Sequence, residues 1–189
     1  MQSPVLILAS SSPRRRELLG LFGLPFDVRH ANVDERPHPG ESPGAMTERL
    51  ASAKASAVAA DWPDHWVLGG DTTVSLDGRI LGKPANRADA ASMLACLSGR
   101  SHEVISAVTL LGPGFQDAHR SRSIVDFMTL SPAMIESYCD SGEPFDKAGG
   151  YGIQGPAGTF VKSIHGSYSG IVGLPLYETR LLLQRAALL

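Results

Sequence analysis

Apolar runs alternate with amphipathic stretches from the start of the chain. Residues 5–9 form a continuous apolar run that is typical of a buried strand, and residues 14–22 have the spacing of a helix. Ser12 is placed to cap this helix, Pro13 suits its first position, and Gly23 suits its end. The first part of the chain is therefore predicted to be a strand that runs directly into a capped helix.

Helical spacing returns over residues 43–60. Met46, Leu50 and Val58 fall on one stripe, and Lys54 interrupts that apolar face. A lysine in this position either extends along the helix to place its ammonium in solvent or carries its charge into a binding site. The pattern alone leaves both interpretations open.

The remaining segments continue the alternation. Strands are predicted at residues 26–29, 66–69, 73–76, 79–81, 104–111, 123–130 and 160–164; helices are predicted between Asn86 and Leu97, between Ser131 and Gly142, and over residues 175–188. Loops are predicted at residues 33–43, 112–122 and 142–158. Strands that alternate with helices favour an α/β architecture, and the lack of a repeat or linker predicts a single domain over residues 1–189.

Charge and composition exclude several classes of protein. The 189 residues include 17 Lys and Arg against 19 Asp and Glu, a net charge of -2, which argues against a protein that coats nucleic acid or a membrane through a basic surface. The apolar run at residues 5–9 is too short for a signal sequence or a membrane span, so a cytoplasmic protein is expected. Cys96 and Cys139 lack the spacing of a redox or zinc pair and are expected to be small buried hydrophobic residues.

The turn before the first helix carries unusual charge. Arg14, Arg15 and Arg16 occupy the first helical turn, where the helix dipole disfavours each cation by roughly 0.3–1 kcal/mol. Free backbone N–H groups, serine hydroxyls and guanidinium groups at a helix start together suit a phosphate. The alternative is that the arginines are solvated and partly offset by Glu17.

Two glycine motifs do not carry the function that they suggest. Residues 150–155 fit the GxGxxG pattern of dinucleotide-binding folds, but a loop precedes them and a strand follows. Residues 78–83 resemble a P-loop but are one residue short between the glycines, and Pro84 replaces the required Ser or Thr. Dinucleotide binding and P-loop chemistry are therefore rejected.

Polar residues lie at the ends of several predicted strands. Asp71 and Thr72 follow an apolar strand, Lys83 follows another, and residues 146–147 precede the glycine-rich loop. Ligands of open α/β sheets bind at strand ends, so Asp71 is expected either to hold a divalent cation or orient water, or only to cap a turn. Glu35 is either a second carboxylate of that site or a solvated loop acid.

Seven motifs follow one another along the chain: LASSSPRR (8–15), VDE (33–35), LGGDTTV (68–74), LGKP (81–84), LSGRSHEV (97–104), GEPFDKAGGYGIQG (142–155) and GSYSGIVGLPL (166–176). Their order resembles that of one family, the Maf family of nucleotide pyrophosphatases. The resemblance implies a fold related to inosine triphosphate pyrophosphatases, in which an elongated mixed sheet separates two lobes around a nucleotide cleft. It also implies hydrolysis of a nucleoside triphosphate to monophosphate and pyrophosphate with Mg²⁺ or Mn²⁺.

Three positions are similar to the subgroup of this family that accepts dTTP and UTP. They are Arg14, Thr72 and Gln154, whereas the subgroup that prefers 7-methyl-GTP carries Trp, Gln and Glu at the matching places. Gln154 and Thr72 are expected to read the pyrimidine edge, since a Gln amide offers both a donor and an acceptor. Gly70 and Ser11 depart from the family, where Ala and Gly are common, and neither has a chemical role.

A hypothesis for the mechanism joins the residue chemistry to the resemblance. A divalent cation is expected on Glu35 and Asp71, and Asp71 is the proton acceptor that the family implies. The sequence does not decide whether Asp71 is a base, a metal ligand or both. The triphosphate is expected to contact Ser10, Ser12, Arg15, Lys54 and Lys83.

The resemblance also bears on the cellular role. It implies arrest of cell division or the exclusion of modified nucleotides such as 5-methyl-UTP and pseudo-UTP, in a protein that is often a homodimer. The alternative function is a nucleotide-binding regulator of septum formation that does not turn its ligand over. A regulator would need the phosphate-binding residues but not the carboxylate of Asp71, so the sequence favours the enzyme.

Overall fold

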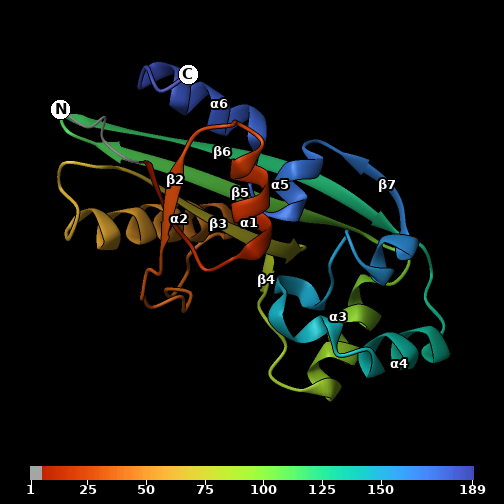
Figure 1. The fold of residues 1–189 in the computed structure, drawn as a ribbon. Coiled ribbons are helices and arrows are strands. Elements are labelled where there is room, and N and C mark those ends of the chain that lie inside the picture. Colours follow the sequence, from red (N-terminus) through yellow and green to blue (C-terminus); the bar gives the residue numbers. More distant parts are fainter. Residues whose placement is uncertain (1–5) are drawn as a thin grey trace.

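The fold is built on one seven-stranded mixed sheet (Figure 1). The structure is a computed structural model that describes residues 6–189. Val5, the first residue of the first predicted strand, lies outside the described residues. The sheet order is β2-β1-β3-β5-β6-β7, with β4 paired to β3. The strands are β1 (Leu6–Ala9), β2 (Phe26–Arg29), β3 (Trp66–Leu76), β4 (Arg79–Leu81), β5 (Ser101–Gly112), β6 (Phe115–Phe127) and β7 (Val161–His165).

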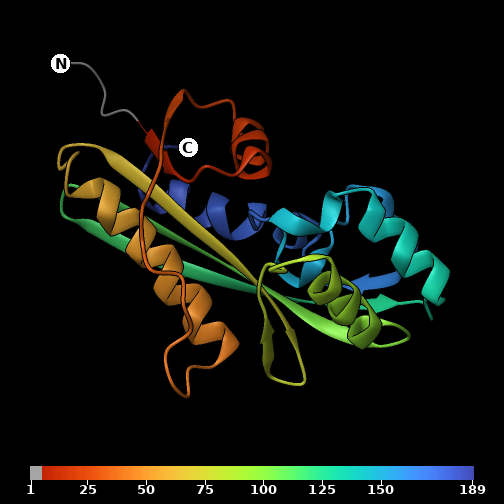
Figure 2. The same ribbon diagram turned by 90° about the horizontal axis from the view of Figure 1, so that it is seen from below.

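Helices cover both faces of the sheet and one of its ends. The α-helices are α1 (Pro13–Gly20), α2 (Pro43–Ala59), α3 (Arg87–Leu97), α4 (Pro132–Asp140), α5 (Tyr168–Val172) and α6 (Leu176–Arg185), and the short 3-10 helices are η1 (Glu143–Asp146), η2 (Ala148–Gly150) and η3 (Pro156–Phe160). Figure 2 shows α2 on one face of the long strands and α1 and α6 on the other, while α3 and α4 gather at the far end. This is the mixed α/β fold expected, elongated along β3, β5 and β6. No helix within residues 6–189 has the length and apolar character needed to cross a membrane.

The hydrophobic core is divided among these layers. Successive side chains of a strand point to opposite faces, so Leu6 and Leu8 of β1 pack with α1 and α6, while Ile7 packs with α2. A third and larger cluster, which includes Leu94 and Phe127, fills the end of the sheet under α3 and α4. The two-lobed arrangement follows from these separate cores.

Strand β3 is longer than predicted, and it includes Asp71. The pattern predicted two strands with Asp71 between them, but β3 is continuous because β5 pairs antiparallel with residues 67–75. On the opposite edge, β1 pairs only with residues 66–69 and β4 only with residues 74–76. Asp71 therefore does not end its own strand; it lies just past the end of the neighbouring strand β1.

Local signals fixed the helix starts well. Ser12 accepts a hydrogen bond from the Arg15 N–H, and Asn86 and Ser131 cap α3 and α4 in the same way. The end of α1 was predicted too late, because the helix stops at Gly20 and residues 21–23 continue only as turns.

Other predictions were wrong. The loop expected over residues 112–122 is mostly strand, since β6 begins at Phe115 and pairs with β5, and β6 ends at Phe127 rather than at residue 130. The short helix α5 was missed. Cys139 is buried as expected, whereas Cys96 is exposed on α3.

Candidate functional site

A cavity of about 1050 Å³ opens beside the unpaired edge of β3, where β1 has ended and β4 has not begun. It is lined from both lobes, by the turn after β1, by α2, by the segment after β4 and by the glycine-rich segment after η1. The side chains predicted for the site all line this cavity: Ser10, Ser12, Arg14, Arg15, Glu35, Lys54, Asp71, Thr72, Lys83 and Gln154.

Two carboxylates converge on one buried ammonium in this cavity. The Nζ atom of Lys54 lies 2.7 Å from Oδ1 of Asp71 and 2.6 Å from Oε1 of Glu35. Lys54 is only 7% exposed, so its charge does not reach solvent along the helix. The interruption of the apolar stripe on α2 is explained by this pair of ion pairs.

Close packing of α2 against β3 makes this cluster geometrically feasible. A Cβ atom added at Gly69 would lie 2.3 Å from the carbonyl oxygen of Ala51 in α2. Only glycine allows the helix backbone to approach the strand so closely. Gly69 and Asp71 lie on the same face of β3 by the period of two, so the approach that Gly69 permits brings Lys54 to Asp71.

The charges around Glu35 favour its ionised form. Partial burial acts to raise the pKa of Glu35, but the hydrogen bond and charge of Lys54, with the charges of Lys83 and Arg15, lower it below its ordinary value. For Arg15 burial has the opposite effect and lowers the pKa, although the carboxylates of Asp71 and Glu35 act to raise it. The cavity therefore combines ionised groups of both signs at short range.

Arg15 is fixed on the opposite face of β3 by three acceptors. Its Nε atom donates to the carbonyl oxygen of Gly173 at 2.8 Å, Nη1 donates to Oγ of Ser10 at 3.3 Å, and Nη2 donates to Oγ1 of Thr72 at 3.2 Å. Thr72 Oγ1 lies 2.8 Å from Oγ of Ser106, which donates to the Gly170 carbonyl at 2.6 Å. A chain of hydrogen bonds thus joins the start of α1 to β3, β5 and α5.

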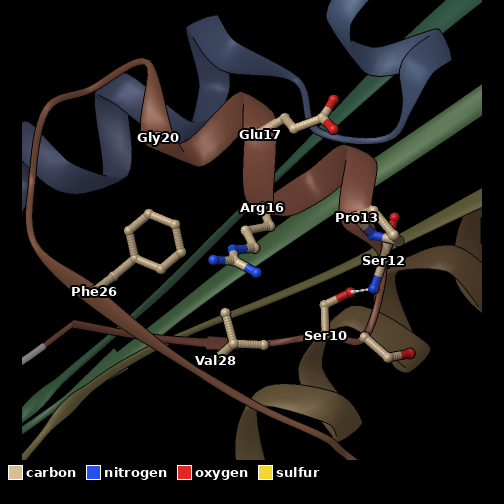
Figure 3. A pocket seen from close by; sticks show the side chains of 9 residues that line it. Ser10, Ser12, Pro13, Arg16, Glu17, Gly20, Phe26 and Val28 are labelled. Carbon is tan, nitrogen blue, oxygen red and sulfur yellow. Dashed lines mark hydrogen bonds between the residues drawn. The ribbon is translucent and has the colours of Figure 1, made fainter.

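The serine-rich turn is held in shape by its own hydroxyl groups. Oγ of Ser10 accepts the Ser12 N–H at 3.2 Å (Figure 3), and Oγ of Ser12 accepts the Arg15 N–H at 3.4 Å. A second hollow of about 450 Å³ also borders this turn, and Arg16 extends there toward Phe26 and Val28 of β2 (Figure 3). The carboxylate cluster lines the larger cavity and not this hollow, so the chemistry belongs to the larger one.

Charged residues from the glycine-rich segment face the serine-rich turn across the cavity. Nη1 of Arg14 lies 3.6 Å from Oδ2 of Asp146, and Nζ of Lys147 lies 2.6 Å from Oδ1 of the same residue. Lys83 and Gln154 are both exposed on the cavity wall. The sequence predicts no role for Lys147. It directly follows η1, and nothing in the sequence shows that η1 lies against the start of α1.

No group of three or more His, Cys, Asp or Glu side chains within residues 6–189 is arranged to hold a metal ion. The carboxylates predicted as metal ligands, Glu35 and Asp71, do come together, with Lys54 between them. Their roles, and those of the other predicted residues, stay predictions.

The Maf-like protein family model matches residues 5–186, nearly the whole chain. The chain belongs to the Maf family. Among curated relatives, a protein named dTTP/UTP pyrophosphatase from Chromobacterium violaceum is 51% identical over 183 residues, which covers 94% of this chain and 92% of that protein. Proteins with the same name from Symbiobacterium thermophilum and Myxococcus xanthus are 50% and 48% identical, covering 92% and 97% of this chain and 90% and 93% of theirs.

Proposed function

We propose that this Maf protein hydrolyses dTTP and UTP to the nucleoside monophosphate and pyrophosphate. The observation that carries the proposal is the cluster of Asp71, Lys54 and Glu35 in a cavity of about 1050 Å³ that is also lined by Arg15 and Lys83. Cations in such a cavity suit a triphosphate, and a buried carboxylate suits the activation of water. The names of relatives that are about half identical over most of the chain support the pyrimidine substrates.

The triphosphate half of the substrate would lie against the serine-rich turn. Ser10 uses its oxygen as an acceptor for Ser12 and Arg15, which leaves its own proton to donate to a phosphate oxygen. Arg15 and the exposed Lys83 supply positive charge, and Lys54 reaches the phosphates only if its ammonium moves from the carboxylates that it now contacts. Positioning and charge stabilisation account for most of the catalysis of phosphoryl transfer.

Asp71 would act as the proton acceptor. Its Oδ1 is held by Lys54, and Oδ2 takes no hydrogen bond from the described side chains, so this oxygen is left to receive a proton from water. The water oxygen bonds to the α-phosphorus, the bond from that phosphorus to the bridging oxygen breaks, and the electron pair leaves with pyrophosphate. Lys54 thereby orients the base rather than reacting.

Glu35 and Asp71 fit the demands of a divalent cation. Mg²⁺ commonly binds through one or two protein carboxylates and completes its shell with water and substrate phosphates, and these two carboxylates converge within 2.7 Å of one atom, the Nζ of Lys54. When bound, Mg²⁺ or Mn²⁺ would neutralise charge that develops on the phosphate oxygens. A cation in this position would take over the charge balance that Lys54 now provides.

The base would lie against the glycine-rich segment. Gln154 is exposed on the cavity wall, where its amide can pair with the imide and carbonyl groups shared by uracil and thymine. Arg14 lies near Asp146, the last residue of η1, just before this segment. We retain Thr72 as a specificity residue, although its hydroxyl contacts Arg15 and Ser106.

The decisive experiment measures pyrophosphate release from dTTP and UTP with Mg²⁺ or Mn²⁺. Asp71→Asn is expected to lower kcat by about a hundredfold or more, the usual contribution of a general base, while nucleotide binding persists. Asp61→Asn, at an exposed position outside the cavity, is the matched control. Equal turnover by wild type and Asp71→Asn would remove the assigned role, and wild-type binding without turnover would establish the regulator instead.

A substrate panel extends this proposal to the cell. The pocket would accept 5-methyl-UTP and pseudo-UTP together with dTTP and UTP, because all four present the same imide edge to Gln154. Preference for the modified nucleotides would favour a role in excluding them over a role in arrest of cell division.

We also propose a cytoplasmic homodimer. Light scattering of the purified protein is the direct test of the dimer.

A further inference from the structure

His102 belongs to the motif LSGRSHEV but has no part in the proposed chemistry. It lies near the start of β5, is 2% exposed, and its Nε2 atom lies 2.6 Å from the hydroxyl of Tyr151. The other ring nitrogen, Nδ1, is buried without a hydrogen-bond partner among the described residues. The bond to Tyr151 is thus the one polar contact of a buried side chain.

The surroundings of His102 keep it neutral. Its ring packs edge to face against Phe127 and Tyr151, with centroid distances of 5.0 and 5.4 Å. Burial lowers the pKa of His102 to about 4, against the opposite effect of Asp126. Either neutral tautomer satisfies the contact, because a phenol hydroxyl both donates and accepts.

Tyr151 connects this buried pair to the nucleotide cavity. It is buried, it lines the cavity, and it precedes residues 152–155, which contain Gln154. Gly149 and Gly150 just before it have positive φ angles of 70° and 71°, so the backbone turns sharply into Tyr151. The side chain of Tyr151 is the first anchor after this turn.

Few backbone contacts hold the segment that follows. Residues 152–155 belong to no strand or helix. The Gly155 N–H donates to the Gly152 carbonyl at 3.2 Å, the Gly155 carbonyl accepts the Gly158 N–H at 2.9 Å, and the Gly152 N–H lies 3.4 Å from the Tyr138 hydroxyl. Ile153 packs against the core cluster that contains Tyr151, so the position of Gln154 depends on a small set of neighbouring anchors. The end of the segment that precedes Gln154 is fixed to the sheet through Tyr151 and His102.

We propose that His102 is a positioning residue for base recognition. Its hydrogen bond to Tyr151 fixes residues 152–155 to β5, which holds Gln154 against the base while leaving the phosphate side unaffected. The proposal rests on the proposed function, because it takes Gln154 as the residue that contacts the base.

The test compares binding of the whole substrate with binding of its phosphate half. Tyr151→Phe removes one oxygen and is expected to raise the KM for UTP and dTTP about fivefold, equivalent to one neutral hydrogen bond. It should leave kcat within about twofold and the inhibition constant of inorganic tripolyphosphate unchanged. Tyr177→Phe, at an exposed tyrosine on α6, is the matched control and should change neither quantity.

Variants of His102 complete the test. His102→Gln places an amide nitrogen near the position of Nε2 and is expected to restore most of the wild-type KM, whereas His102→Leu should match Tyr151→Phe. The double variant His102→Leu with Tyr151→Phe should be no worse than either single variant, because both remove the same bond. If His102→Leu fails to fold, Tyr151→Phe alone decides the outcome.

Two results would overturn the positioning role. One is a parallel loss of UTP and tripolyphosphate binding, which indicates general disruption of the fold. The other is an unchanged KM in Tyr151→Phe. If wild type binds UTP without hydrolysing it, the proposed function fails, but calorimetric titration of Tyr151→Phe and Gln154→Ala with UTP still tests the positioning of Gln154.

Discussion

Asp71 and Thr72 are consecutive residues of β3, yet their side chains bind partners on opposite faces of the sheet. Asp71 accepts a hydrogen bond from Lys54 of α2, and Thr72 accepts one from Arg15 of α1. The period of two in a strand requires this division. Because the strand edge is unpaired at residues 70–73, both faces open into one cavity. A single short segment therefore positions the carboxylate cluster and the buried arginine together.

Replacing Thr72 by Val tests how the second face acts. Val keeps the shape of Thr but leaves Nη2 of Arg15 and the hydroxyl of Ser106 without this partner. We expect kcat/KM for dTTP and UTP to fall together by about tenfold, and Thr72→Ser to retain most of the activity. The measurement is a steady-state comparison across UTP, dTTP and CTP. A change in preference among these bases at unchanged overall efficiency would support the specificity role retained for Thr72 and would exclude the role through Arg15.

Lys54 is expected to be needed for stability and for activity. Lys54→Met leaves Asp71 buried beside Glu35 with no ammonium between them, and removal of one partner from a buried ion pair costs about 3 kcal/mol of unfolding free energy or more. We expect kcat to fall by at least about tenfold, because the carboxylate of Asp71 loses the group that orients it.

Urea unfolding and pyrophosphate release measure the two effects of Lys54 separately. Lys162→Met, at an exposed lysine of β7, is the control and should be close to wild type in both. A stable and fully active Lys54→Met protein would mean that the ion pairs in the cavity do not matter for either property.

Features with local signals were predictable from the sequence. Ser12 and Pro13, like Ser131 and Pro132, mark helix starts through hydrogen bonds that span only three residues. The pattern marked Lys54 as unusual, because a cation on an apolar stripe is costly unless something pairs with it, but it left a solvated ammonium equally open. The set of cavity residues followed from this chemistry together with the resemblance to the Maf family, because phosphate and metal ligands belong to few residue types while Arg14, Thr72 and Gln154 came from the resemblance alone.

Features set by distant pairing were not predictable. The first half of β6 looks like a polar loop because β7 pairs only with residues 124–127, so residues 115–123 form an exposed sheet edge that needs few apolar side chains. Asp71 seemed to end a strand because Ala107 of β5, the residue that pairs with it and continues β3, is distant in the sequence. The bond of His102 to Tyr151 joins residues 49 positions apart, and no local pattern reports such a contact.

Gly70 and Gly69 are expected to respond oppositely to alanine. A Cβ atom at Gly70 would lie 3.5 Å from Nε of Arg15 and from the carbonyl oxygen of Ala107, which is ordinary contact. Gly70→Ala should therefore raise the free energy of unfolding by about 0.4–1 kcal/mol through the unfolded chain. Gly69→Ala would place its Cβ 2.3 Å from the Ala51 backbone and should lower stability by at least about 2 kcal/mol.

Chemical denaturation of this matched pair of variants checks both signs. The two positions are adjacent in β3 and differ only in the face of the sheet on which a side chain would lie. Destabilisation by both substitutions to a similar extent would indicate that β3 tolerates no side chain beside the cavity, contrary to the contacts of Gly70.

The acid stability of the protein is expected to depend on His102. Its pKa is about 4 in the folded protein and near 6.5 in the unfolded chain, so between these values the unfolded state binds more protons. The contribution of neutral His102 to the free energy of unfolding is therefore fully present above pH ~6.5. It falls by roughly 3 kcal/mol as the pH drops to ~4. Urea unfolding at several pH values should show this loss in wild type but not in His102→Gln, relative to the stability of each protein at neutral pH. His165→Gln, at an exposed histidine of β7, should keep the wild-type profile, and an identical acid loss in His102→Gln would mean that His102 is protonated in the folded protein.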